Sequence, residues 1–214
     1  MKKHIRNILV ALMTLSLLML AGCGGGSSET VEAPDASEAE TPAVETADPI
    51  GIHHAEIEIR DYGTVSVELD GDTAPITVQN FMDLANAGFY NGLTFHRIID
   101  GFMIQGGDPN GDGTGGSGKN IPGEFEANGY TNNIAHTKGV ISMARAQDPN
   151  SASSQFFIMV ADAPHLDGMY AAFGHVTDGQ DVVDKIAADA APLDDNGTMA
   201  PEDQPVIESV KIID

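Results

Sequence analysis

Side chains suited to gripping a peptide are concentrated in residues 95–108 (FHRIIDGFMIQGGD). Arg97 carries a guanidinium that stays charged and offers five N–H donors in a fixed fork. Gln105 can donate to a peptide carbonyl and can orient that guanidinium, while Phe102 and Met103 offer apolar surface. Because side chains alternate along a strand, we expect Met103 and Gln105 on one face. Such a set can bind a chain through hydrogen bonds and apolar contact, without a nucleophile, a metal or a proton donor.

The elements that must position these side chains are short. Alternating apolar and polar residues predict strands at 54–59, 63–69, 94–99, 102–105, 139–144, 156–160, 171–176 and 206–213. Helices are predicted over 73–86, with Pro75 in the first turn, and over 178–188. Many short strands with Gly-rich turns and two helices predict a mainly β fold, a closed β-barrel capped by two α-helices.

Several motifs follow one another in a fixed order. After 95–97 (FHR) and 102–108 (FMIQGGD) come 113–116 (GTGG), 139–144 (GVISMA), 154–158 (SQFFI), 166–168 (LDG) and 173–174 (FG). This series resembles the signature of the cyclophilin-type peptidyl-prolyl cis-trans isomerases, from about residue 55 to residue 213. Motifs in register are far more specific than one short pattern. The resemblance implies eight antiparallel strands in a closed barrel, no cofactor or metal, and substrates that are unfolded or partly folded proline-containing polypeptides.

The reaction that this resemblance implies breaks no covalent bond. Amide resonance holds an Xaa-Pro bond behind a barrier of about 18–20 kcal/mol, so uncatalysed rotation takes tens of seconds. A gain of about ten-thousand-fold, roughly 5–6 kcal/mol, requires a site that favours the twisted amide over both planar forms. The resemblance assigns catalysis to Arg97, Phe102 and Gln105. It assigns substrate binding to His96, Met103, Ala144, Arg145, Gln155, Phe157, His165, Leu166 and Tyr170.

The roles within that set differ. The resemblance makes Arg97 the hydrogen-bond donor to the carbonyl of the rotating residue or to the prolyl nitrogen. It gives the proline ring an apolar slot, lined by Phe102, Met103, Phe157 and Leu166. The chain at Ala144 and Arg145 is expected to hydrogen-bond the substrate through its backbone. His96 is placed on the rim as a positioning group.

Three residues depart from the best-known eukaryotic members of the family. His165 stands where those members have Trp, Tyr170 where they have His, and Arg145 where they have Asn. Loss of the indole and its N–H donor at position 165 predicts weakened cyclosporin binding more than weakened catalysis. Tyr170 still offers a ring face and a hydroxyl, and the backbone of Arg145 is unchanged by its side chain.

The N-terminus has the pattern of an export signal. Three cations in residues 1–6 precede an apolar run at 8–20, which is shorter than a spanning helix requires. Residues 20–23 (LAGC) resemble the lipobox of bacterial lipoproteins, which implies a signal peptide over 1–22 and a lipidated Cys23. Acids without Lys or Arg then fill a predicted disordered linker, 23–50, before the isomerase domain, 51–214. We expect an exported monomer, anchored to the cell membrane by lipid with its domain outside the cytoplasm.

The charge balance argues against a nucleic-acid partner. The chain has 32 acids against 10 Lys and Arg, a formal charge of -22, and phosphate backbones are bound mainly through Lys and Arg. Without residues 1–22 the charge is -25, because 7 cations remain against 32 acids. A chain this acidic cannot hold to anionic lipid by charge, so the anchor would have to be the lipid on Cys23.

Two other functions are consistent with parts of the sequence. A non-catalytic proline-binding chaperone module would keep the apolar pocket and lack Arg97 or Gln105, and this chain has both. A calcium-binding surface protein is suggested by residues 108–113 (DPNGDG), which open like an EF-hand loop, but Lys119 stands where that loop needs Glu. Residues 196–198 (NGT) form a glycosylation sequon by pattern only.

Overall fold

The computed structural model describes residue 48 and residues 50–214. The strands are β1 (Ile52–Ile59), β2 (Gly63–Asp70), β3 (Thr94–Ile99), β4 (Met103–Asp108), β5 (Val140–Met143), β6 (Phe156–Met159), β7 (Ala172–Asp178) and β8 (Ile207–Ile212). The helices are α1 (Pro75–Asn86) and α2 (Gln180–Asp189), with short 3₁₀ turns η1 (Glu126–Asn128), η2 (Pro164–Leu166) and η3 (Pro201–Asp203). Every predicted strand and both predicted helices are present, with bounds shifted by at most 3 residues.

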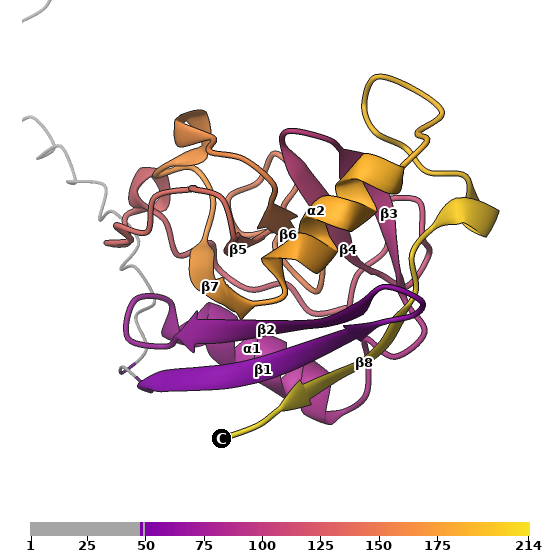
Figure 1. The fold of residues 1–214 in the computed structure, drawn as a ribbon. Helices are drawn as coiled ribbons and strands as arrows, with labels where there is room; N and C mark the ends of the chain where they lie inside the picture. Colours follow the sequence, from indigo (N-terminus) through magenta and orange to yellow (C-terminus); the bar gives the residue numbers. More distant parts are fainter. Residues whose placement is uncertain (1–47, 49) are drawn as a thin grey trace, which may run out of the picture. The chain divides into compact units, whose positions relative to one another are not determined.

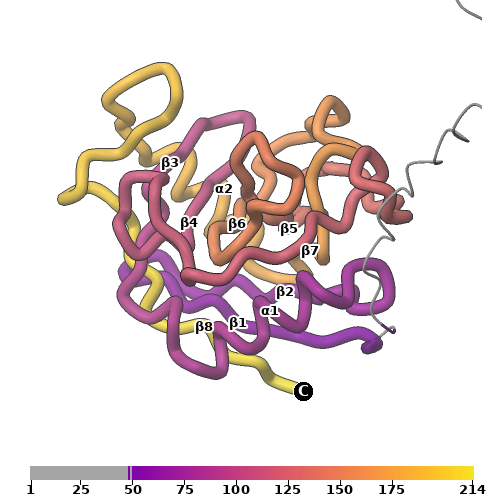
Figure 2. Tube along the Cα trace, turned by 180° about the vertical axis from the view of Figure 1, so that it is seen from behind, coloured from indigo at the N-terminus to yellow at the C-terminus, as the bar shows by residue number. Residues whose placement is uncertain are grey.

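The sheet curls but does not close, so the expected closed barrel is wrong. Its antiparallel strands run in the order β3-β4-β6-β5-β7-β2-β1-β8, with β3 and β8 at the two edges (Figures 1 and 2). These edges meet at one isolated bridge, Thr94 to Val206, and through a few backbone bonds beside it. Pro205, just before β8, has no N–H and offers only its carbonyl, which accepts from the N–H of Phe95 at 2.9 Å. The fold is therefore an open half-barrel.

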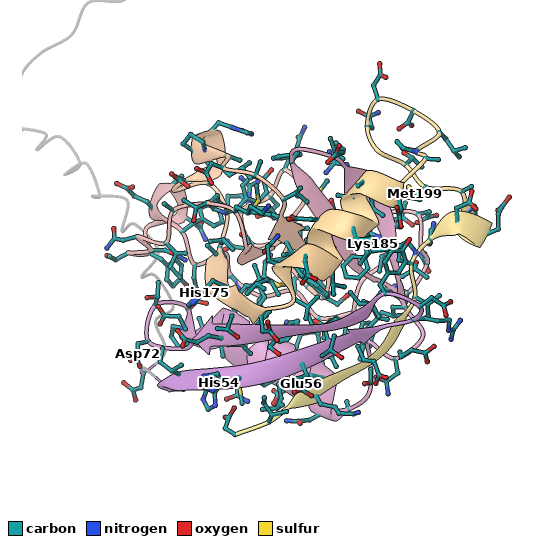
Figure 3. The ribbon with its side chains drawn as sticks, in the orientation of Figure 1. His54, Glu56, Asp72, His175, Lys185 and Met199 are labelled. Carbon is teal, nitrogen blue, oxygen red and sulfur yellow. The ribbon has the colours of Figure 1, made fainter. Side chains whose placement is uncertain are left out.

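Alternation along the strands separates the core from the surface. In β1, Ala55, Ile57 and Ile59 are buried, whereas His54 and Glu56 lie on the other face (Figure 3). β5 and β6 are buried along their whole length, as expected of strands covered on both faces. Besides the main core there is a smaller apolar cluster that includes Met103, Phe157 and Leu166. These three residues were all expected at the site.

The helices cover different parts of the sheet. Helix α1 packs against β8 and β2, and α2 packs against β2 and β4; Figure 1 shows α2 in front of the sheet and α1 behind β1 and β2. The N-terminus of α1 has no local side-chain cap. The buried carboxylate of Glu124 instead accepts from the N–H groups of Ile76 and Thr77 at 3.1 and 2.7 Å. This long-range cap ties the loop before η1 to the helix.

Several predictions concern the N-terminal part of the chain. The signal peptide (1–22), the lipidated Cys23 and nearly all of the linker (23–50) lie outside the described residues. Among residue 48 and residues 50–214, no helix is both long enough and apolar enough to cross a membrane.

Candidate active site

A small cavity opens where β3, β4 and β6 meet the η2 turn. Its volume is about 230 Å³, and its lining consists of Arg97, Phe102, Met103, Gln105, Ala144, Arg145, Phe157, Leu166 and Tyr170. Gln105 pairs with Phe157 across β4 and β6, which places Met103, Gln105 and Phe157 on one side of the sheet, as strand alternation predicts. Phe102 reaches the cavity from the turn before β4. The walls are therefore mostly apolar, with two arginines and one amide at the rim.

Arg97 is held at this cavity by neutral partners. Its Nε donates to the carbonyl of Asn196 at 2.7 Å, and its Nη1 donates to Oε1 of Gln105 at 3.2 Å and approaches Sδ of Met103 at 3.7 Å. Burial is the main cause that lowers the pKa of the guanidinium, and the charge of Asp194 opposes it. A half-buried cation with spare N–H donors at the mouth of an apolar cavity can bond an amide that loses its resonance.

A relay of amides extends from Arg97 into a Gly-rich loop. Gln105 accepts from Arg97 and donates through Nε2 to Oε1 of Gln155 at 2.9 Å. The Nε2 of Gln155 donates to the carbonyls of Gly113 and Gly115 at 3.1 and 2.8 Å. Gln155 is thus a positioning group for Gln105. It also lines a second cavity of about 430 Å³, which shares Gln105, Ala144 and Arg145 with the first.

A loop that sequence reasoning left without a role positions Arg97. The carboxylate of Asp194 accepts from the backbone N–H of Asn196 at 3.0 Å and of Thr198 at 3.1 Å, and from the Thr198 hydroxyl at 3.0 Å. The backbone of this loop then joins β3. Arg97 and Thr198 form an isolated antiparallel β-bridge, and the N–H of Ile98 donates to the carbonyl of Gly197 at 2.8 Å. Figure 3 marks Met199, where the chain leaves the loop. A backbone carbonyl has no residue signature, so nothing in the sequence indicated this contact.

A buried histidine supports the cavity wall from behind. The His136 ring stacks on Phe157, with ring centroids 6.1 Å apart. Its Nε2 lies 3.0 Å from the Ser142 hydroxyl and its Nδ1 lies 3.0 Å from Oδ1 of Asp167, next to Leu166. Ser142 is fully buried, so no substrate reaches this Ser–His–Asp arrangement. Its role is to hold Phe157 and Leu166 in place.

One expected site residue lies elsewhere. His96 does not lie on the rim: it is 4% exposed, and neither of its ring nitrogens has a hydrogen-bond partner in the structure. Phe95 and His96 are both buried, at the point where the register of β3 against β4 shifts between Phe95 and Arg97. Burial is the main cause that lowers the pKa of His96. His96 therefore belongs to the interior behind the site.

The remaining expected residues surround the cavity. His165 is exposed and stacks on Phe102, with centroids 5.8 Å apart, without lining either cavity. Tyr170 meets Phe157 edge-on at 5.9 Å. The Ala144 N–H is already used, since it donates to the Gln155 carbonyl at 2.9 Å, so the backbone acceptor left for a substrate at this residue is its carbonyl.

The EF-hand-like segment forms a closed turn. Asp108 accepts from the backbone N–H groups of Asn110, Asp112 and Gly113 at 2.6–3.2 Å, and Asp112 accepts from Thr114. The carboxylate oxygens thus serve the loop itself. In the part of the chain that the structure describes, no three His, Cys, Asp or Glu side chains are grouped so as to hold a metal.

Comparison with known proteins agrees with this geometry. Residues 54–212 match the family model described as cyclophilin type peptidyl-prolyl cis-trans isomerase/CLD. The chain is 49% identical over 121 residues to peptidyl-prolyl cis-trans isomerase B of Bacillus subtilis, which covers 56% of this chain and 81% of that protein. It is 43% identical over 156 residues to peptidyl-prolyl cis-trans isomerase A of Dickeya dadantii, covering 71% and 80%.

Solved structures are similar over nearly their whole length. A crystal structure of a cyclophilin type peptidyl-prolyl cis-trans isomerase from Cryptosporidium parvum matches with a TM-score of 0.67 at 31% identity, over 76% of this chain and 98% of that one. A second structure of it, determined in the presence of the dipeptide Ala-Pro, matches with a TM-score of 0.66 at 31% identity, over 75% and 99%.

The buried histidines predict a loss of stability in mild acid. Burial is the largest cause lowering the pKa of His136, as it is for His96. The unfolded chain takes up protons on both at a higher pH than the folded chain does, so stability falls as the pH drops below about 6.5. In urea unfolding between about pH 7.5 and 5.5, the free energy of unfolding should therefore fall less steeply with pH in His136→Gln than in the wild type.

The control for this measurement is His175→Gln, which replaces a histidine whose side chain is 53% exposed. It should keep the wild-type slope. A His136→Gln protein whose slope equals that of the wild type would contradict the assignment.

The Asp194 loop predicts an effect on turnover from outside the cavity. Asp194→Ala removes the acceptor that shapes the loop, so the Asn196 carbonyl shifts and Arg97 loses its fixed position. We expect kcat for isomerisation of an Xaa-Pro peptide to fall about three- to ten-fold while KM changes less than about two-fold. Asp194→Asn, which keeps one acceptor oxygen, should recover part of the loss. Asp195→Ala, at an exposed neighbour with no side-chain bond in the structure, should behave as wild type, and an equal loss there would refute the role of Asp194.

Proposed function

The chain belongs to the cyclophilin-type peptidyl-prolyl cis-trans isomerases, and from that membership we propose that it speeds the folding of exported proteins at the outer face of a membrane. It is an isomerase of Xaa-Pro peptide bonds. The observation that carries the proposed chemistry is the pairing of Arg97 with Gln105 at the mouth of the 230 Å³ apolar cavity.

Rotation about the Xaa-Pro bond passes through a twisted amide, in which the nitrogen lone pair no longer conjugates with the carbonyl. The apolar walls formed by Phe102, Met103 and Phe157 hold the proline ring, because burying apolar surface is favourable for every state of the substrate. That contact alone binds the planar and twisted forms alike and leaves the barrier unchanged. Selectivity for the twisted form has to come from a directional group.

Arg97 supplies that group. A planar amide nitrogen has no lone pair to accept a hydrogen bond, whereas a twisted one does. A guanidinium N–H aimed at the prolyl nitrogen or at the neighbouring carbonyl therefore bonds the transition state better than either ground state. Since Asn196, Gln105 and Met103 already orient the guanidinium, little ordering is needed when the substrate arrives.

The contacts of the other residues support smaller roles. Gln105 orients Arg97 and presents its amide to the flanking chain, and Gln155 holds Gln105. Leu166 and Tyr170 complete the wall, and the chain at Ala144 offers a carbonyl. His165 stacks on Phe102 from outside, so cyclosporin, which would meet an imidazole there in place of an indole, is expected to bind weakly. We expect a monomer.

A non-catalytic chaperone module remains the second candidate. It would use the same cavity for proline-containing segments without rotating the bond. The contact between Arg97 and Gln105 favours the enzyme, because binding a proline ring needs no oriented cation. Both activities predict proline peptides as ligands, so only a rate measurement separates them.

Export and anchoring rest on the sequence of the N-terminus. The charged start, the apolar run and Leu-Ala-Gly-Cys support cleavage before Cys23 and lipidation of its thiol. The acid-rich linker would hold the domain away from the membrane, since like charges extend a chain. Exported chains begin unfolded, and slow proline rotation limits their folding.

The catalytic role of Arg97 predicts a split between turnover and binding. Arg97→Lys keeps the charge and loses the oriented fork, so kcat should fall about a hundred-fold with little change in KM. Phe157→Ala removes a wall of the cavity and should raise KM as well. Arg60→Gln is the control, because Arg60 pairs with Glu208 away from both cavities. An Arg97→Lys enzyme with wild-type kcat would sink the proposed mechanism.

The anchor is tested separately from catalysis. Cys23→Ser should move the protein from the membrane fraction to the soluble fraction and remove the mass of a lipid from the N-terminal peptide. The isomerase activity of the released protein should be unchanged. A Cys23→Ser protein that stays with the membrane would contradict the lipid anchor and leave the isomerase assignment intact.

A further inference from the structure

The two cavities of the site are an electropositive exception on an acidic protein. The chain has 32 acids and 10 Lys and Arg. Yet among the described residues that line the cavities there is no Asp or Glu, and the charged side chains are Arg97 and Arg145. Arg145 lines both cavities. Its position makes it the cation that a substrate residue beside the bound proline would meet.

Arg145 is fixed in place by groups that do not cancel its charge. Its guanidinium carbon lies 5.1 Å from the centroid of the Phe125 ring and 4.7 Å from that of Tyr170. Its Nε and Nη2 donate to the carbonyl of Met169 at 3.1 and 2.9 Å, and its Nη1 donates to that of Ala146 at 2.9 Å. All of these partners are neutral.

Three cations outside the cavities are paired with carboxylates, unlike Arg145 and Arg97. Arg60, Lys138 and Lys185 each form an ion pair with a carboxylate. Arg145 forms none within residue 48 and residues 50–214, and Nη2 engages one carbonyl with one of its two N–H groups. The stacked, half-buried side chain therefore offers a free N–H and an uncompensated charge beside both cavities.

We propose that Arg145 makes this site prefer proline-containing chains that carry an acidic residue next to the proline. The inference rests on the proposed isomerase function and adds a substrate class to it. The negative charge of the whole domain acts against acidic substrates only weakly at the site, because salt screens charges beyond about 8 Å at physiological ionic strength. At contact distance the interaction of an acidic substrate residue with the site is set mainly by the nearest charged side chain, and that side chain is the cation Arg145. An ion pair with a partly exposed arginine corresponds to a preference of about two- to five-fold.

The test uses three peptides that differ only in the residue beside the proline: Glu, Gln or Lys. One set places that residue before the proline and a second set places it after. For each peptide kcat/KM is measured at low and at high salt. In one of the sets the wild-type protein should prefer Glu over Gln by about two- to five-fold, with Lys lowest, and the preference should shrink at high salt.

Variants separate charge from packing. Arg145→Gln should abolish the Glu preference, and Arg145→Lys, which keeps the charge and loses the stacking, should retain part of it. Lys138→Gln is the control, because Lys138 is a cation that lines neither cavity and is paired with Asp184.

Each remaining outcome overturns the inference in a recognisable way. If the ratio of kcat/KM for the Glu peptide to kcat/KM for the Gln peptide is the same in the wild type and in Arg145→Gln, charge selection by Arg145 is refuted. If Arg145→Gln lowers kcat/KM equally for all three peptides, Arg145 contributes only to the cavity wall and does not select for charge. Absence of activity toward every peptide in the wild type would refute the isomerase function itself, which is a different failure.

Discussion

The whole site depends on holding one cation still at the edge of an apolar cavity. Burial of Arg97 costs hydration, and this cost is what lowers its pKa. A carboxylate partner would offset the cost but would also occupy the donors that the substrate needs. The protein uses neutral acceptors instead, the carbonyl of Asn196 and the amide oxygen of Gln105. The charge remains free to act on the amide, and the guanidinium still has a defined direction.

The open sheet explains how these partners meet. Arg97 and Gln105 pair directly across β3 and β4, and β6 lies next to β4, so Phe157 stands opposite Gln105. Since β3 is an edge strand, the Asp194 loop can pair with its free side and deliver the Asn196 carbonyl. In a closed barrel another strand would fill that edge. The departure from closure and the positioning of Arg97 are therefore connected.

Sequence patterns predicted the elements well and the supporting contacts poorly. Alternation placed Met103, Gln105 and Phe157 on one face because each lies inside a regular strand. It did not place Phe102, which lies in a turn and was assigned by the resemblance alone. The expectation that His96 lies on the rim was wrong, because its side chain is buried. Closure could not be read from strand count, since it depends on how β3 and β8 meet around Pro205. The roles of Asn196 and His136 left no signal, because one acts through its backbone and the other lies behind the wall.

The central claim is that Arg97 recognises the twisted amide and not the proline peptide as such. The direct measurement is calorimetric binding of two ligands, a planar Xaa-Pro peptide and a mimic in which a ketoamide fixes the carbonyl out of plane, to the wild type and to Arg97→Ala. We predict that the substitution weakens binding of the mimic at least about ten-fold and binding of the planar peptide less than about three-fold. Equal weakening of both ligands, or of neither, would contradict the account.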